Sequence, residues 1–336
     1  MTVTREALES APSLVLSPAV VAHRGASGHR PEHTLDAYRT AIRMGVDDIE
    51  LDLVATRDGV LVARHDLELS ATTDVAGRPE LAHLHRSLTV DGEDQVGWFV
   101  QDFTLRDLKT IATRERMPGT RPANTAYDGA EGIPTLTEVL AMVGAESARR
   151  GRPVGVLLEL KHATHHDAIG LSLDVPLLRE LSRQGLDHPW ARVALLSFEA
   201  PILRRLAGRT RLPIIQLLEA GEELTPETLD RIDEYADGIG PHTSLVLPRD
   251  SGGAIGEPST LVRDAHRRGL TVHVWTVRGE NRFLPTNLRH GAAPDALGDM
   301  TGMVRALLAA GADGVITDHP EAALAAMRES LVAVGH

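Results

Sequence analysis

Short apolar runs alternate along the chain with longer stretches in which apolar residues recur every three or four positions. The short runs suit buried strands, and the longer spacing suits amphipathic helices. We predict strands at residues 20–22, 46–53, 60–63, 154–160, 193–196, 214–217, 238–240, 271–277 and 314–316. We predict helices at residues 33–44, 105–113, 136–149, 176–183, 201–206, 226–235, 259–268, 301–310 and from 320 onward. Strands that alternate with helices indicate βα units and a parallel sheet.

About eight such units follow one another, which favours a closed (β/α)8 barrel over an open sheet. Residues 72–101 and 118–133 lack a clean period and carry several glycines and prolines, so we interpret them as long loops or a small insertion. Residues 281–299 form a second irregular stretch. Long loops of a barrel usually lie at the mouth of its active site.

The composition excludes several functional classes. The 336-residue chain has 35 Lys and Arg against 47 Asp and Glu, a net charge of −12, and no long basic run. Nucleic-acid binders and proteins that adsorb to anionic membranes need a basic surface, so we expect neither. Because the chain has no Cys, it has no disulfide, thiolate zinc site or cysteine nucleophile.

The apolar segments are too short for a membrane protein. No run reaches the roughly 18 residues that a spanning helix requires. The most apolar N-terminal stretch, residues 14–22, contains Pro18 and follows no basic segment, so it makes a poor signal peptide. We therefore expect no stable membrane insertion and a cytoplasmic location, unless a leader has been removed.

Polar residues stand at the predicted carboxyl ends of several strands, the edge of a barrel that builds its active site. These residues are His23 and Arg24, Glu50 and Asp52, His65, and Glu159 with Lys161. Residues two apart on a strand face the same way. Three carboxylates and a lysine are therefore predicted in one barrel mouth.

Three carboxylates in a confined mouth repel one another unless a cation joins them. Glu50, Asp52 and Glu159 are therefore candidate ligands of one divalent cation. Oxygen ligands suit Ca²⁺ or Mg²⁺, whereas Zn²⁺ more often recruits imidazoles. The alternative interpretation is a set of solvated or salt-bridged strand ends.

Two histidines and two cations complete the candidate site. His23 and His65 are the natural acid/base pair, because imidazole titrates near neutrality. Arg24 offers a planar fork for phosphate oxygens, and Lys161 offers a point charge. With a metal, these groups can neutralise a phosphodiester anion and the charge of its transition state.

A dense, ordered series of motifs extends these observations. The motifs are AHRGASG at 22–28, PEHT at 31–34, IELDL at 49–53, TRDG at 56–59, HD at 65–66, DFTL at 102–105, ELK at 159–161, YADGIGP at 235–241, VHVWTVR at 272–278 and GVITDHP at 314–320. The series resembles the glycerophosphodiester phosphodiesterase family, and within it the bacterial periplasmic-type branch. The resemblance covers roughly residues 20–325.

The resemblance implies a barrel with a small insertion after its second strand. We expect an N-terminal extension over residues 1–18 and one barrel domain over residues 19–333, with the insertion at about 67–133. The implied reaction is hydrolysis of small glycerophosphodiesters, such as glycerophosphocholine and glycerophosphoethanolamine, to sn-glycerol 3-phosphate and an alcohol. The oligomeric state stays open.

The resemblance also implies residue roles. It puts metal ligation on Glu50, Asp52 and Glu159, acid/base catalysis on His23 and His65, phosphate contact on Arg24 and Lys161, orientation of Arg24 on Glu32, and the wall around the glycerol on Phe198 and Trp275.

Two other functions stay open. A lysophospholipase D-type phosphodiesterase of the same superfamily must admit an acyl chain, and the 3% aromatic content argues modestly against it. A non-catalytic barrel that binds a phosphorylated ligand is expected to have lost at least one competent side chain, yet all are present. Just after Lys161, three residues could contact the leaving alcohol or form a solvated loop: His162, His165 and His166.

Overall fold

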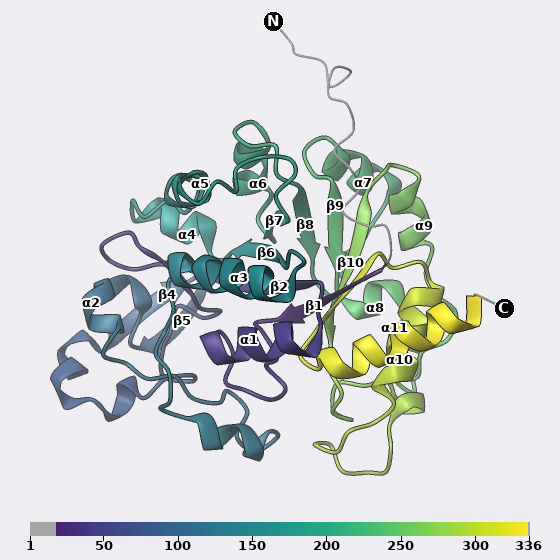
Figure 1. Ribbon diagram of the computed structural model, residues 1–336, viewed down its shortest axis with the longest axis horizontal. Helices are drawn as coiled ribbons and strands as arrows, with labels where there is room; N and C mark the ends of the chain where they lie inside the picture. The colour runs from purple at the N-terminus through teal and green to yellow at the C-terminus, as the bar shows by residue number, and fades with distance from the viewer. Residues whose placement is uncertain (1–17, 335–336) are drawn as a thin grey trace, which may run out of the picture.

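Eight parallel strands close into a barrel in the computed structural model, which describes residues 18–334 (Figure 1). In spatial order they are β1 (Ala19–His23), β2 (Asp48–Ala55), β6 (Gly155–Leu160), β7 (Val193–Ser197), β8 (Ile214–Leu218), β9 (Gly238–Pro241), β10 (Thr271–Val277) and β11 (Gly314–Thr317). Pairing of β11 and β2 with β1 closes the ring. The predicted (β/α)8 fold is confirmed. The predicted N-terminal extension, apart from Pro18, lies outside the described residues.

Helices follow the strands and pack around the barrel (Figure 1). They are α1 (Leu35–Met44), α3 (Leu136–Arg150), α4 (Ala163–Ala168), α5 (Asp174–Arg183), α6 (Ala200–Ala207), α7 (Pro226–Asp233), α8 (Thr243–Val246), α9 (Leu261–His266), α10 (Met300–Ala309) and α11 (Pro320–Val334). Capping residues define the ends of α1: the Thr34 side chain accepts a hydrogen bond from the Ala37 N–H at the first turn, and Gly45 ends the helix in the left-handed region. No helix within residues 18–334 is long and apolar enough to cross a membrane.

The barrel has two apolar layers because successive strand residues face opposite sides. Small and branched side chains such as Val21, Leu157 and Ile316 form one cluster, on the strand faces that carry the site residues. The opposite strand faces pack against the helices in a larger cluster that includes Leu158 and Leu177. Both clusters consist mostly of Ala, Val, Leu and Ile, which agrees with the 3% aromatic content of the chain.

The segment between β2 and α3 forms a small unit beside the barrel, at the left of Figure 1. It contains β3 (Leu61–Ala63), which pairs antiparallel with β2, the hairpin β4 (Arg86–Val90) and β5 (Glu93–Gly97), α2 (Leu105–Leu108), and four 3₁₀ turns at Val75–Gly77, Pro79–Leu84, Val100–Asp102 and Pro122–Tyr127. A further 3₁₀ turn, Thr286–Leu288, lies in the loop after β10. The insertion has its own apolar cluster, built around Phe99 and Phe103.

The structure adds a hairpin to this segment and shows that one helix prediction is wrong. Residues 72–101 contain a hairpin, whose strands are mostly solvent-exposed and therefore lack an apolar run. Its turn, Asp91-Gly92, takes positive φ at both residues, as tight hairpin turns prefer. The helix predicted at 105–113 ends at Leu108, because Ala112 pairs with Gly132 and donates its N–H to Asp74.

Candidate active site

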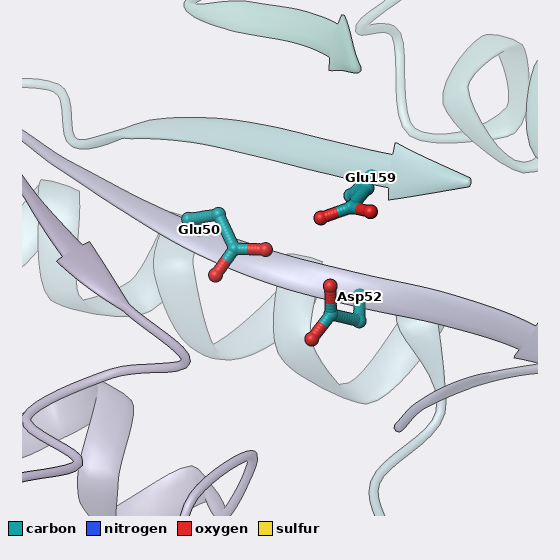
Figure 2. A group of neighbouring side chains, drawn as sticks. All are labelled: Glu50, Asp52 and Glu159. Carbon is teal, nitrogen blue, oxygen red and sulfur yellow. The ribbon is translucent and has the colours of Figure 1, made fainter. Parts of the chain in front are cut away.

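The three predicted carboxylates come together at the carboxyl ends of two paired strands. Glu50 and Asp52 extend from β2, and Glu159 extends from β6 beside Asp52 in the strand register. Figure 2 shows the three side chains converging, and one oxygen of each lies within 4.8 Å of the others. All three are buried.

Burial and mutual repulsion set the proton affinities of this cluster. Burial, together with the Asp52 and Glu159 charges, raises the pKa of Glu50 well above its ordinary value. Burial also raises the pKa of Glu159 to about 8, against the opposing field of Lys161. Although burial favours the neutral acid, Arg24 and Lys161 hold the pKa of Asp52 well below its usual range.

The cluster has the donor atoms that a divalent cation needs. Oε1 of Glu50 and Oδ1 of Asp52 are buried and accept no hydrogen bond within the described residues. A buried carboxylate oxygen without a partner is costly, and a bound cation would remove that cost. The cluster therefore fits a hard divalent cation.

His23 ends β1 and is held by a buried carboxylate. Its Nδ1 lies 2.6 Å from Oδ1 of Asp318, just after β11. Asp318 Oδ2 accepts hydrogen bonds from Arg121 at 2.6 Å and from Arg278 at 2.8 Å. Burial and Arg24 lower the pKa of His23 to about 4, although Asp318 opposes the shift. His23 is therefore neutral at pH 7, with Nε2 left for proton transfer.

His65 follows β3 and, like His23, has a carboxylate oxygen beside its Nδ1. Its Nδ1 lies 2.5 Å from Oδ1 of Asp66, whose other oxygen is 2.7 Å from Arg116. Burial and the Arg24 charge lower the pKa of His65 to about 4. Both histidines thus have a carboxylate on Nδ1, which orients each ring.

Arg24 lies between the carboxylate cluster and Glu32. Its Nη1 donates to both oxygens of Glu32 at 3.2–3.3 Å, and its Nε lies 3.1 Å from Oδ2 of Asp52. Arg116 also donates two hydrogen bonds to Glu32, at 2.6 and 2.7 Å. The structure thus has the Glu32–Arg24 contact that the predicted orienting role requires, and that role stays a prediction.

Lys161 lies between Glu159 of the carboxylate cluster and a pair of aromatic rings. Nζ of Lys161 lies 2.9 Å from Oε1 of Glu159 and 5.3 Å from the centre of the Phe198 ring. Phe198 meets Trp275 edge to face at 5.4 Å, and the indole N–H donates to the Gly240 carbonyl at 2.6 Å. Both rings pack against the interior apolar cluster, and their predicted role as the wall around the glycerol stays a prediction.

The motifs contain two partners that we did not predict. Asp318 lies in the GVITDHP motif. It lies just after the predicted strand at residues 314–316, and that position could have marked it as a residue of the active-site edge of the barrel. His33, in the PEHT motif, bridges Oδ2 of Asp52 at 2.8 Å and the Tyr38 hydroxyl at 2.7 Å. Arg116 and Arg121 lie in irregular parts of the insertion, where no sequence pattern marks them.

Comparison with known proteins agrees with this geometry. The family model for the glycerophosphoryl diester phosphodiesterase family matches residues 23–322. The chain belongs to this family. Family members depend on a divalent metal, and the acidic cluster is where this chain could hold one.

Relatives from distant organisms support the family assignment. A glycerophosphodiester phosphodiesterase of Arabidopsis thaliana is 33% identical over 80% of this chain and 76% of its own. One of Bacillus subtilis is 31% identical over 79% of this chain and 80% of its own. An Oleispira antarctica phosphodiesterase, solved with the product sn-glycerol 3-phosphate, shares the fold with a TM-score of 0.62 at 21% identity, over 95% of this chain and all of that one.

The three histidines after Lys161 have separate environments in this family member. His165 and His166 lie in α4, and His162 directly precedes it. His166 is fully buried, and Nε2 of His165 lies 2.7 Å from the Gln101 side chain. Only His162 lines the cavity that also contains His65 and Lys161.

Proposed function

We propose that this protein hydrolyses water-soluble glycerophosphodiesters to sn-glycerol 3-phosphate and an alcohol. One arrangement carries the proposal: a buried three-carboxylate cluster flanked by two histidines, each with a carboxylate on Nδ1. Family membership supports the reaction class, as does the product bound in the Oleispira antarctica structure.

Glu50, Asp52 and Glu159 would hold one divalent cation, Ca²⁺ or Mg²⁺. These hard cations prefer oxygen ligands and accept water in the remaining positions. When bound, the cation would polarise the phosphoryl oxygens and offset the charge of the transition state.

The cationic side chains would position the phosphate. Arg24 uses Nε and Nη1 to contact Asp52 and Glu32, which leaves Nη2 for a phosphate oxygen. Lys161 would supply a second positive charge from the neighbouring strand end.

The histidines would move the protons. One neutral imidazole would accept the proton of the attacking hydroxyl or water through Nε2. The other would first take up a proton from solvent and then donate it to the leaving oxygen. The carboxylates of Asp318 and Asp66 hold the rings and favour the protonated state of each.

The direct test uses EDTA-stripped protein with glycerophosphocholine or lysophosphatidylcholine, and adds Ca²⁺, Mg²⁺ or Mn²⁺ separately. Choline release is measured for both substrates, and glycerol 3-phosphate for the first. We expect cation-restored release from glycerophosphocholine. Faster turnover of the lysolipid would favour the lysophospholipase D alternative, and no turnover by folded protein would contradict the proposal.

A further inference from the structure

A cavity of about 320 Å³ lies between the catalytic residues and the insertion. His65 and Lys161 line its barrel side, and Glu68, Val90 and Gln95 line its insertion side. This volume is at the lower end of the roughly 300–1,000 Å³ of small-molecule sites. Because the cavity includes one of the two proposed acid/base histidines, a group bound there would lie beside the reacting phosphate.

Glu68 is held rigidly at the edge of this cavity. Its Oε1 accepts hydrogen bonds from the Ser70 hydroxyl at 2.6 Å and from the Trp98 N–H at 3.1 Å, and its Oε2 accepts from the Ser70 N–H at 2.9 Å. The side chain also lies against Gly97 so closely that any Cβ there would collide with it. The insertion thus fixes the Glu68 carboxylate in place.

Glu68 is also the carboxylate of this cavity without a cationic partner. Within residues 18–334 it forms no ion pair, and its hydrogen bonds come from neutral groups. The other charged side chains of the cavity are paired: Lys161 with Glu159, His162 with Asp91, and Asp66 with Arg116 and His65. The cavity therefore presents one uncompensated negative charge.

An alcohol with a positive charge matches this environment. An ammonium group near Glu68 would supply the missing countercharge, and Leu67 and Val90 offer apolar surface for its methyl or methylene groups. A zwitterionic alcohol such as serine would gain less, because its carboxylate would be repelled by Glu68 and would offset the attraction of its ammonium group.

We propose that this cavity binds the leaving alcohol and that Glu68 selects glycerophosphodiesters of cationic amino alcohols over those of neutral alcohols. The selection rests on the proposed function, since it concerns the alcohol that the reaction releases. It makes Glu68 a specificity-determining residue that the motifs do not mark.

The kinetic test compares kcat/KM for glycerophosphocholine with kcat/KM for glycerophosphoglycerol, with the activating cation present. We expect Glu68→Gln to lower this ratio roughly fivefold, the size of an ion pair near the surface, and Glu68→Asp to retain part of the selectivity. Glu93→Gln is the matched control, because it removes an exposed charge from the β4–β5 hairpin, outside the cavity. An unchanged ratio in Glu68→Gln would overturn the proposal.

A binding test separates this proposal from the proposed function. Ligand-observed NMR measures binding of choline and of its neutral isostere 3,3-dimethyl-1-butanol to the wild type and to Glu68→Gln, with Ca²⁺ present. We expect the wild type to bind choline more tightly and the variant to lose that difference. Inactive protein with a Glu68-dependent choline preference would refute the reaction and retain the site. Active protein without the preference would refute the site alone.

Discussion

The barrel strands and the insertion build one site in different ways. Glu50, Asp52 and Glu159 stand on paired strands, so the register of β2 and β6 places their oxygens. Arg116 and Arg121 come from irregular segments and reach the site through ion pairs. Strands supply the side chains that need fixed spacing, and the insertion supplies cations that hold carboxylates.

This division matches the separation of the insertion's apolar cluster from those of the barrel. The insertion packs around Phe99 and Phe103, separately from the cluster between the strands and helices. We therefore expect a change in the insertion to affect specificity or orientation more than the spacing of the proposed ligands. The predictions below test that separation, from the largest expected effect to the smallest.

His65 lies at the junction of the two regions, and its removal should have the largest effect. We expect His65→Ala to lower kcat by about 10²–10⁴-fold through loss of proton transfer. Calorimetric titration should show metal affinity nearly intact, because the side chain is outside the carboxylate cluster. His83→Ala is the control, since His83 is exposed on the insertion. Activity within a few-fold of wild type would remove His65 from the acid/base role.

Glu159 tests the strand-borne cluster. Glu159→Gln keeps the shape but loses a ligand charge, so metal affinity and activity should fall together. The loss should be at least the roughly 10–100-fold seen when a ligand's own partner is removed. Titration of activity against Ca²⁺ or Mg²⁺ measures both effects, and an unchanged metal dependence would exclude Glu159 as a ligand.

Asp318 tests how a barrel residue positions His23. Asp318→Asn should lower kcat by roughly 10–100-fold, because the ring loses its orienting charge. The carboxylate raises the pKa of His23 against burial, so its removal should shift the acidic limb of the kcat/KM profile to lower pH. A profile that does not move would show that Asp318 is only structural.

Arg116 tests the insertion, and its effect should be smaller. Arg116 is partly exposed and contacts Glu32 and Asp66. Such an ion pair is worth about 1 kcal/mol, so Arg116→Met should lower kcat less than about tenfold. The exposed Arg114, changed to Met, is the control. A loss as large as that of His65→Ala would contradict the proposed separation between the roles of the strands and of the insertion.

The smallest effect concerns stability and pH. In the folded protein without metal the pKa of Glu159 is about 8, above the ordinary value of 4.5. Raising the pH from 4.5 to about 8 therefore destabilises the folded state, because over this range the folded state binds more protons than the unfolded chain. Added Ca²⁺ replaces the proton, so its gain in Tm should be larger at pH 8 than at pH 6.5, by roughly 2–4 °C. A gain that falls with pH would contradict this.

The barrel and its strand-end residues could be predicted because their signals are local. Alternation along β2 places Glu50 and Asp52 on one face, whatever lies elsewhere in the chain. Apolar runs also mark the strands, and β10 begins and ends where the pattern predicts. The β4–β5 hairpin gave no such signal beyond its Asp-Gly turn, because its strands are mostly exposed.

The sequence by itself determined the alternating architecture, the chemistry of the strand ends and the motifs that resemble the family. Only the tertiary structure decided which partners hold the proposed catalytic groups. Asp318 reaches His23, 295 residues away, because β11 pairs with β1 and closes the ring. Arg116, Arg121 and Glu68 act through ion pairs and hydrogen bonds between distant segments, and such contacts leave no periodic trace in the sequence.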